Sequence, residues 1–190
     1  GVHACGNVAV FDTEARMAAD KFSYALNQRL PEDIRIQDSC EVPADFHPRF
    51  QKTVKTYEYR ILNREFPLPA YRFNSHFTYR KLDVERMRQA AAYLIGEHDF
   101  QSFCAAGAQV KTTVRTIYAL DVEKQGDLII LRITGNGFLY NMVRIIAGTL
   151  MKIGQGDWEP ECIPEILAGC DRQLAGPTAP ARGLTLMEIH

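Results

Sequence analysis

Residues 55–62 alternate between two kinds of side chain, and this pattern constrains the fold more than any other in the 190-residue chain. Tyr57, Tyr59 and Ile61 fall on one side, with polar residues between them. Because successive side chains of a strand point to opposite faces, the pattern predicts a β-strand with one buried face. Residues 111–134 predict a hairpin, with its turn at Gly126. The chain therefore contains antiparallel strands.

Helical and strand patterns alternate along the rest of the chain. Helices are predicted over 17–30, 82–95, 138–153 and 160–168, further strands over 8–11, 34–42 and 183–189, a short turn or strand over 99–103, and a long loop over 63–74. Their spacing lacks the regular βαβ repeat of a parallel sheet. The expected fold class is α+β, with an antiparallel or mixed sheet and helices packed on one face. We expect one domain over 1–190, with a subdomain boundary near 66–74 as the alternative.

The overall composition excludes several classes of protein. Lys and Arg number 22 and Asp and Glu number 23, so any surface that binds nucleic acid must be local. The five Cys are odd in number and form no C-x-x-C pair, which disfavours a zinc ribbon or a disulfide framework and indicates a reducing cytoplasm. The five His lack metal-ligand spacing, and the chain has no apolar run that would span a membrane. We expect no metal and no membrane segment.

Arg144 is the strongest anomaly among the charged residues. The stretch 138–150 is otherwise apolar or uncharged. Burying an unpaired charge is very costly, so the guanidinium needs a partner or an exit to water. Two interpretations stay open from the sequence: an arginine paired with a carboxylate, or a helix-end arginine that reaches solvent.

Aromatic and basic side chains gather between residues 46 and 57. Tyr57 is either ordinary core packing or a stacking platform for a base, and we assign Tyr59 to the core. The segment ahead of this strand mixes aromatic rings with Arg49, Lys52 and Lys55. Such mixtures bind unpaired nucleotides, although charged runs are often only solvated faces. Arg115 is a candidate phosphate contact.

An ordered set of short segments resembles the tRNA pseudouridine synthase A family over essentially the whole chain. The segments are Gly1-Val2-His3-Ala4, Phe46-His47-Pro48-Arg49-Phe50, Lys55-Thr56-Tyr57-Glu58-Tyr59, Asp99-Phe100-Gln101-Ser102-Phe103, 136–144 and Gly183-Leu184-Thr185-Leu186. The resemblance implies an isomerase that converts uridine to pseudouridine in the anticodon stem-loop of tRNA. It also implies a cytoplasmic homodimer with tRNA lying across both subunits, and no metal or organic cofactor.

The resemblance further implies roles for individual residues. In the family, Gly-Val-His-Ala ends the Arg-Thr-Asp-Ala-Gly-Val-His-Ala loop, whose Asp is the nucleophile. That Asp is expected two residues before Gly1, so we expect this chain to be truncated at its N terminus and inactive alone. Arg144 would pair with the Asp, Tyr57 would stack on the uracil and assist proton removal, and Leu184 or Leu186 would line the uracil pocket. The remaining expected substrate contacts are His3, Phe46, His47, Arg49, Lys52, Lys55 and Arg115.

Two other classes of function stay open at this point. One is a non-catalytic RNA-binding module. The other is an unrelated small-molecule enzyme with an antiparallel sheet, which would not bind tRNA at all.

Overall fold

A computed structural model of the chain describes residues 1–48, 53–107 and 110–190. By its contacts the chain forms two compact units. The first unit comprises Gly1–Asn7 and Lys52–His190, and the second comprises Val8–Gln51. Residues 66–74 lie within the first unit.

The second unit has less regular structure than the sequence predicts. The helix predicted over 17–30 is shorter, because it consists of the 3₁₀ turn η1 (Ala19–Lys21) and the helix α1 (Phe22–Asn27). The strands predicted over 8–11 and 34–42 are wrong, since both segments lack regular structure. Within residues 34–42, the N–H of Ile36 donates to Oδ1 of Asn27, and the carbonyl oxygen of Ile36 accepts from Nδ2 of Asn27, both at 2.8 Å. An amide side chain thus replaces a partner strand there.

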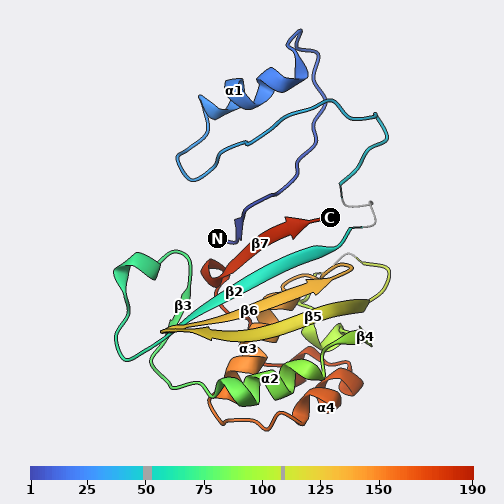
Figure 1. Ribbon diagram of the computed structural model, residues 1–190. Helices are drawn as coiled ribbons and strands as arrows, with labels where there is room; N and C mark the ends of the chain where they lie inside the picture. Colours follow the sequence, from blue (N-terminus) through green and yellow to red (C-terminus); the bar gives the residue numbers. More distant parts are fainter. Residues whose placement is uncertain (49–52, 108–109) are drawn as a thin grey trace. The chain divides into compact units, whose positions relative to one another are not determined.

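A mixed sheet forms the first unit, as predicted (Figure 1). Its strand order is β1-β7-β2-β6-β5-β4, with β3 beside β2. The strands are β1 (His3–Ala4), β2 (Lys55–Asn63), β3 (His76–Thr78), β4 (Gly96–Asp99), β5 (Val114–Gln125), β6 (Leu128–Gly135) and β7 (Leu184–Ile189). The β1–β7 and β2–β3 pairs are parallel, and the other pairs are antiparallel.

The longest strands are the ones that the sequence predicts. β2, the β5–β6 hairpin and β7 confirm the predictions over 55–62, 111–134 and 183–189. The sequence patterns miss β1, β3 and β4, which have two to four residues each. Such short strands are too brief for alternation to be recognised.

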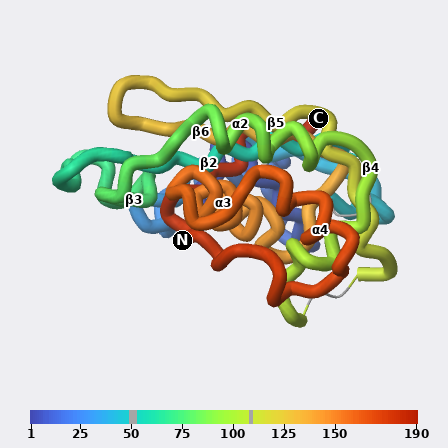
Figure 2. The backbone as a smooth tube through the Cα atoms, turned by 90° about the horizontal axis from the view of Figure 1, so that it is seen from below, coloured from blue at the N-terminus to red at the C-terminus, as the bar shows by residue number. Residues whose placement is uncertain are grey.

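Helices cover one face of this sheet, as expected (Figures 1 and 2). They are α2 (Val84–Ala92), α3 (Met142–Gly154) and α4 (Cys162–Gly169). The connections of this unit also contain the 3₁₀ turns η2 (Pro69–Tyr71), η3 (Gln101–Phe103), η4 (Arg172–Leu174) and η5 (Ala181–Gly183). α3 begins later than the predicted residue 138, because Asn141 before it is left-handed, with φ of 60°. Seen from below, the helices lie in front of the strands (Figure 2).

The main core lies between the sheet and these helices. Tyr59 and Ile61 of β2 are fully buried there against the apolar side chains of α3. Burial of the apolar face of α3 offsets the entropic cost of ordering the chain.

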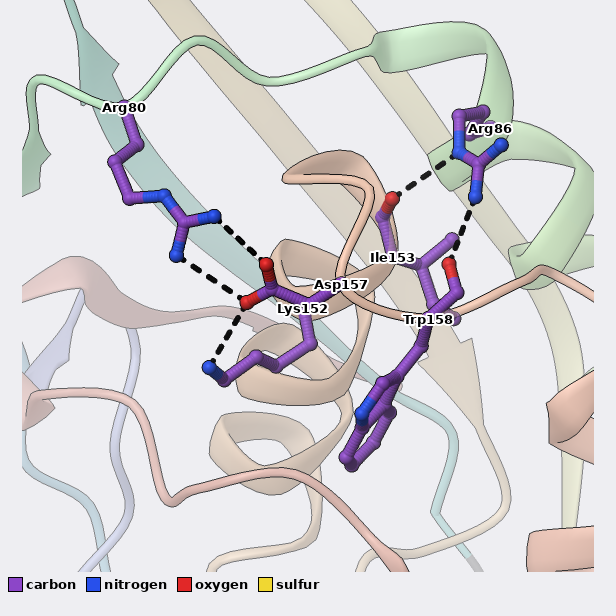
Figure 3. A network of polar contacts seen from close by, with 6 residues as sticks. All are labelled: Arg80, Arg86, Lys152, Ile153, Asp157 and Trp158. Carbon is purple, nitrogen blue, oxygen red and sulfur yellow. Dashed lines mark hydrogen bonds and ion pairs between the residues drawn. The ribbon is translucent and has the colours of Figure 1, made fainter.

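A polar network holds the C-terminal end of α3 (Figure 3). Arg86 of α2 donates to the carbonyl oxygens of Ile153 and Trp158, at 3.3 and 2.9 Å.

Asp157 forms the second half of that network. It accepts from Arg80 at 2.7 Å and from Lys152 at 3.0 Å (Figure 3). The hydrogen bond from Arg80, followed by that from Lys152, lowers the pKa of Asp157 to about 2. In the described ranges, no helix has the length and apolar character needed to cross a membrane.

Candidate active site

Tyr57 lies in a row of residues that runs across neighbouring strands. It stands opposite Leu186 of β7 and Ile133 of β6, and Leu186 stands opposite Ala4 of β1. Leu184 lies opposite Tyr59 in the same pair of strands. Both leucines are buried. The sheet therefore places three sequence-predicted residues, Tyr57, Leu184 and Leu186, on adjoining strands.

Phe138 covers Tyr57 from the connection between β6 and α3. The two ring centroids are 5.2 Å apart and the rings meet edge to face, at 86°. Tyr57 is half-buried, and this burial raises the pKa of its hydroxyl. Its phenol is thus neutral at neutral pH. Arg115 lies beside the same connection, because a Cβ added to Gly137 would meet its Nε at 3.6 Å.

Arg144 lies in the first turn of α3 and is half-buried. Its Nε donates to the carbonyl oxygen of Ala179 at 2.7 Å, and its Nη1 donates to Oδ1 of Asn141 at 2.8 Å. The backbone N–H of Ala179 returns a bond to the carbonyl oxygen of Arg144 at 3.0 Å. Both acceptors of the Arg144 side chain are neutral, so these bonds orient the guanidinium without cancelling its charge.

Residues 176–180, which we call the strap, lie directly on α3. The N–H of Gly176 donates to Oγ1 of Thr149 at 2.9 Å. A Cβ added to Gly148 would overlap the carbonyl oxygen of Pro177. Glycine at 148 therefore allows the strap to approach the helix closely enough for Ala179 to reach Arg144.

Tyr59 holds the end of the strap from the sheet. Its hydroxyl donates to the carbonyl oxygen of Pro180 at 2.9 Å, next to the Ala179 carbonyl that receives Arg144. Burial raises the pKa of Tyr59 strongly, and the positive charges of Arg144 and Arg182 only partly oppose it. Tyr59 is core, as predicted from the sequence, and it also fixes the strap.

The first residue of the chain lies beside the residue that follows this strap. A Cβ added to Gly1 would lie 3.5 Å from the Cβ of Ala181. β1 then runs parallel to β7, and Nε2 of His3 is 2.6 Å from the carbonyl oxygen of Phe73. His3 is therefore placed beside the connection between β2 and β3.

Among the remaining predicted contacts, Lys55 begins β2. Phe46 and His47 belong to the second unit, and their contact with the substrate stays a prediction. Arg49 and Lys52, also predicted as substrate contacts, lie outside the described residues.

The opposite face of β2 holds a charged hollow of about 190 Å³. Glu58 and Arg60 line it, together with Arg132 of β6. Glu58 is buried and binds Arg60 at 2.7 Å and Arg132 at 3.0 Å. Because these side chains alternate with Tyr57 along β2, the hollow lies on the face opposite the Tyr57 side chain. Across residues 1–48, 53–107 and 110–190, no group of His, Cys, Asp or Glu side chains is suited to hold a metal ion.

Sequence reasoning missed the groups that orient Arg144. Asn141 stands three residues before it, a spacing that brings side chains together on a helix. That spacing was a usable indication. The carbonyl oxygens of Ala179 and Pro180 leave no such trace, because any residue supplies one.

Comparisons with known proteins show which family the chain resembles. A family model described as tRNA pseudouridine synthase matches residues 90–190. A tRNA pseudouridine synthase A of Brevibacillus brevis is 51% identical over 190 residues, covering 100% of this chain and 78% of the relative. Proteins of the same name from Acetivibrio thermocellus and Ruminiclostridium cellulolyticum are 47% and 49% identical, with the same coverage of both chains.

Proposed function

The chain belongs to the tRNA pseudouridine synthase family, and we propose that it isomerises uridine to pseudouridine in the anticodon stem-loop of tRNA. Its relatives carry the name tRNA pseudouridine synthase A and align with all of this chain. The family role is the isomerisation of uridine in tRNA. We place the target uridine in the anticodon stem-loop as a proposal for this chain.

The observation that carries the proposal is the position of Arg144. Its guanidinium is held by Ala179 and Asn141, and the strap that contains Ala179 leads to Ala181, beside Gly1. A carboxylate on the segment that precedes Gly1 would therefore enter the region of this cation. We propose that the Asp of the family's Arg-Thr-Asp-Ala motif stands there. Arginine suits it, because the guanidinium fork matches a carboxylate and keeps it ionised.

In the proposed reaction the Asp carboxylate attacks C1′ of the target nucleotide and bonds to it, while the bond between C1′ and N1 breaks and leaves its electron pair on the uracil. The uracil turns, and its C5 bonds to C1′ as the bond between C1′ and the Asp breaks and restores the carboxylate. The hydrogen on C5 leaves as a proton to water and N1 gains a proton, so the product is an isomer of the substrate. The uridine must first leave the RNA stack to reach the Asp.

The environment of Tyr57 favours a role in binding the base over a role in proton transfer. Its raised pKa keeps the phenol protonated at neutral pH, which suits stacking and hydrogen-bond donation. Phe138 packs against the Tyr57 ring at an interplanar angle of 86° and so fixes its orientation. We propose that the uracil stacks on Tyr57 beside Leu186, with Leu184 deeper in the same wall.

We further propose that residues 1–190 form the catalytic domain, and that the enzyme is a cytoplasmic homodimer with tRNA across both subunits. The proposed tRNA contacts are His3, Phe46, His47, Arg49, Lys52, Lys55 and Arg115. Since the net charge is −1, phosphate binding must rest on such local basic residues. tRNA affinity should therefore fall steeply as salt rises.

The test uses the chain extended upstream through Arg-Thr-Asp-Ala, called the extended chain below. tRNA transcripts labelled with tritium at C5 of uridine should release tritium to water when pseudouridine forms. A matched transcript with cytidine at the anticodon stem-loop uridines should release none. Equal release from both transcripts would refute the stem-loop assignment. tRNA binding without any release would instead identify a non-catalytic RNA-binding module.

A further inference from the structure

The connection between β2 and β3 exposes aromatic rings to solvent. Phe66 and Phe73 both lie in it, and each is 66% exposed. Figure 1 shows this connection projecting from the end of the sheet, with the 3₁₀ turn η2 at its tip. Single exposed apolar residues are ordinary, so exposure alone assigns no role. The surroundings of Phe73 set it apart.

Local hydrogen bonds hold the backbone on both sides of Phe73. The buried Ser75 donates from Oγ to the carbonyl oxygen of Tyr71 at 2.9 Å. The N–H of Asn74 donates to the same oxygen at 3.3 Å. The ring is thus presented from a fixed turn. An ordered ring loses less conformational entropy when a ligand binds it.

Arg72 covers one face of the Phe73 ring. Its Cζ lies 4.2 Å from the ring centroid, and its Nη1 donates to the carbonyl oxygen of Pro69 at 3.1 Å. Because the guanidinium occupies one face, the 66% of Phe73 that stays exposed includes the other face. A cation on one face of an aromatic ring adds electrostatic attraction for an anionic ligand to the stacking surface of the ring.

The pair contacts β1, the strand that follows Gly1 and pairs with β7. Nε2 of His3 contacts the carbonyl oxygen of Phe73 at 2.6 Å, and His3 belongs to β1, two residues after Gly1. Burial lowers the pKa of the His76 imidazole in β3, and the positive charge of Arg182 lowers it further. Arg182 is exposed and stands two residues after the strap. A second cation is therefore present at this edge of the sheet.

We propose that Phe73, backed by Arg72, is a stacking platform for an unpaired tRNA base that flanks the target uridine. The inference rests on the proposed function. Aromatic rings stack on any base, so the platform binds RNA without reading its sequence. Arg72 and Arg182 favour a polyanion over an apolar protein segment as the occupant. The platform holds the neighbouring nucleotide while the uridine is turned out toward Tyr57.

The test compares position 73 with position 66, which has the same exposure on the same connection. Dissociation constants of the extended chain for an unmodified anticodon stem-loop RNA are measured at one salt concentration. Phe73→Ala should weaken binding about 5- to 100-fold, the range expected for the loss of one stacked base. Phe73→Trp should retain affinity, and Phe66→Ala should stay within about twofold of the unchanged protein. Melting temperatures should not differ, because both rings are largely exposed.

A fluorescence measurement reports stacking directly. Phe73→Trp should be quenched when the RNA binds and Phe66→Trp should not, with the native Trp158 replaced by Phe in both variants. Equal affinities for Phe73→Ala and Phe66→Ala, or an unquenched Trp at 73, would overturn the platform while leaving the proposed function intact. Sedimentation of Phe73→Ala reports its oligomeric state. A changed oligomeric state with unchanged RNA affinity would overturn the platform in favour of a protein interface. Failure of the unchanged protein to bind the RNA would overturn both proposals.

Discussion

Replacing Gly148 with alanine tests whether the strap orients Arg144. The added Cβ would overlap the carbonyl oxygen of Pro177 and lie 2.9 Å from its carbonyl carbon, so backbone has to move. Overpacking of this kind costs about 1–3 kcal/mol. Displacing the strap also breaks the bonds to Ala179 and Gly176, at about 1 kcal/mol each. Alanine's helix propensity returns about 1 kcal/mol.

The sum predicts a loss of about 2–4 kcal/mol in the free energy of unfolding, or about 5–15 °C in Tm for a chain of this length. Gly154→Ala is the matched control on the same helix. Its Cβ would meet Sδ of Met87 at 2.8 Å, and a flexible thioether can move away, so the change should stay within about 1 kcal/mol.

Two assays decide the outcome. Urea unfolding gives the free energies, and tritium release by the extended chain, at a temperature where all variants are folded, gives the turnover. Gly148→Ala should lose turnover as well as stability, because the Ala179 oxygen no longer fixes Arg144. Wild-type stability and turnover for Gly148→Ala would refute the idea that the strap is held against α3.

Substitutions at four further positions separate base binding, the orientation of Arg144 and the stability of the fold. Tyr57→Ala should lower turnover about 5- to 100-fold, because a stacking contact with the base is lost. Tyr59→Ala empties a buried site and should cost about 3–5 kcal/mol of stability. Melting curves and single-turnover rates check both, and a larger loss of stability in Tyr57→Ala than in Tyr59→Ala would contradict the assignment. Asn141→Gly keeps the left-handed backbone and removes the side-chain oxygen that binds Arg144, so turnover should drop about tenfold at near-normal Tm. Asn141→Asp should restore an acceptor for Arg144. Normal turnover in the glycine variant would argue against a role of Asn141 in orienting Arg144. Asp157 has a pKa of about 2 in the folded chain against an ordinary 3.8, so its stabilising effect is complete above about pH 4 and is lost as the pH falls toward 2. Acid titration of Asp157→Asn should give a flatter stability curve over that interval, and a slope equal to that of the unchanged protein would contradict the assignment.

The elements predictable from sequence are those whose pattern extends over many residues. β2 and the β5–β6 hairpin alternate for eight or more residues, and α3 is apolar for more than three turns. β1 has two residues, so only its pairing with β7 defines it. The error over 34–42 has a similar cause. Its partly alternating residues meet the side chain of Asn27 in place of a second strand, and alternation cannot report whether a partner exists.

The candidate site was predictable in part for related reasons. Arg144 is detectable because a charge stands out in an apolar helix, and Tyr57 because it shares a face with Tyr59. The one carbonyl oxygen that binds the Arg144 side chain comes from Ala179, 35 positions away, and backbone oxygens carry no sequence mark. The role of Phe73 was equally hidden, since only the structure places Arg72 over its ring.

The central claim is that Arg144 serves a nucleophilic Asp supplied by the segment before Gly1. The most direct measurement is tritium release from C5-labelled tRNA by three proteins: residues 1–190, the extended chain, and the extended chain with that Asp changed to Asn. The nucleophile forms a covalent bond, so general acids and bases elsewhere do not replace it. We predict release by the extended chain alone. Release by residues 1–190, or by the Asn variant at the rate of the extended chain, would contradict the account.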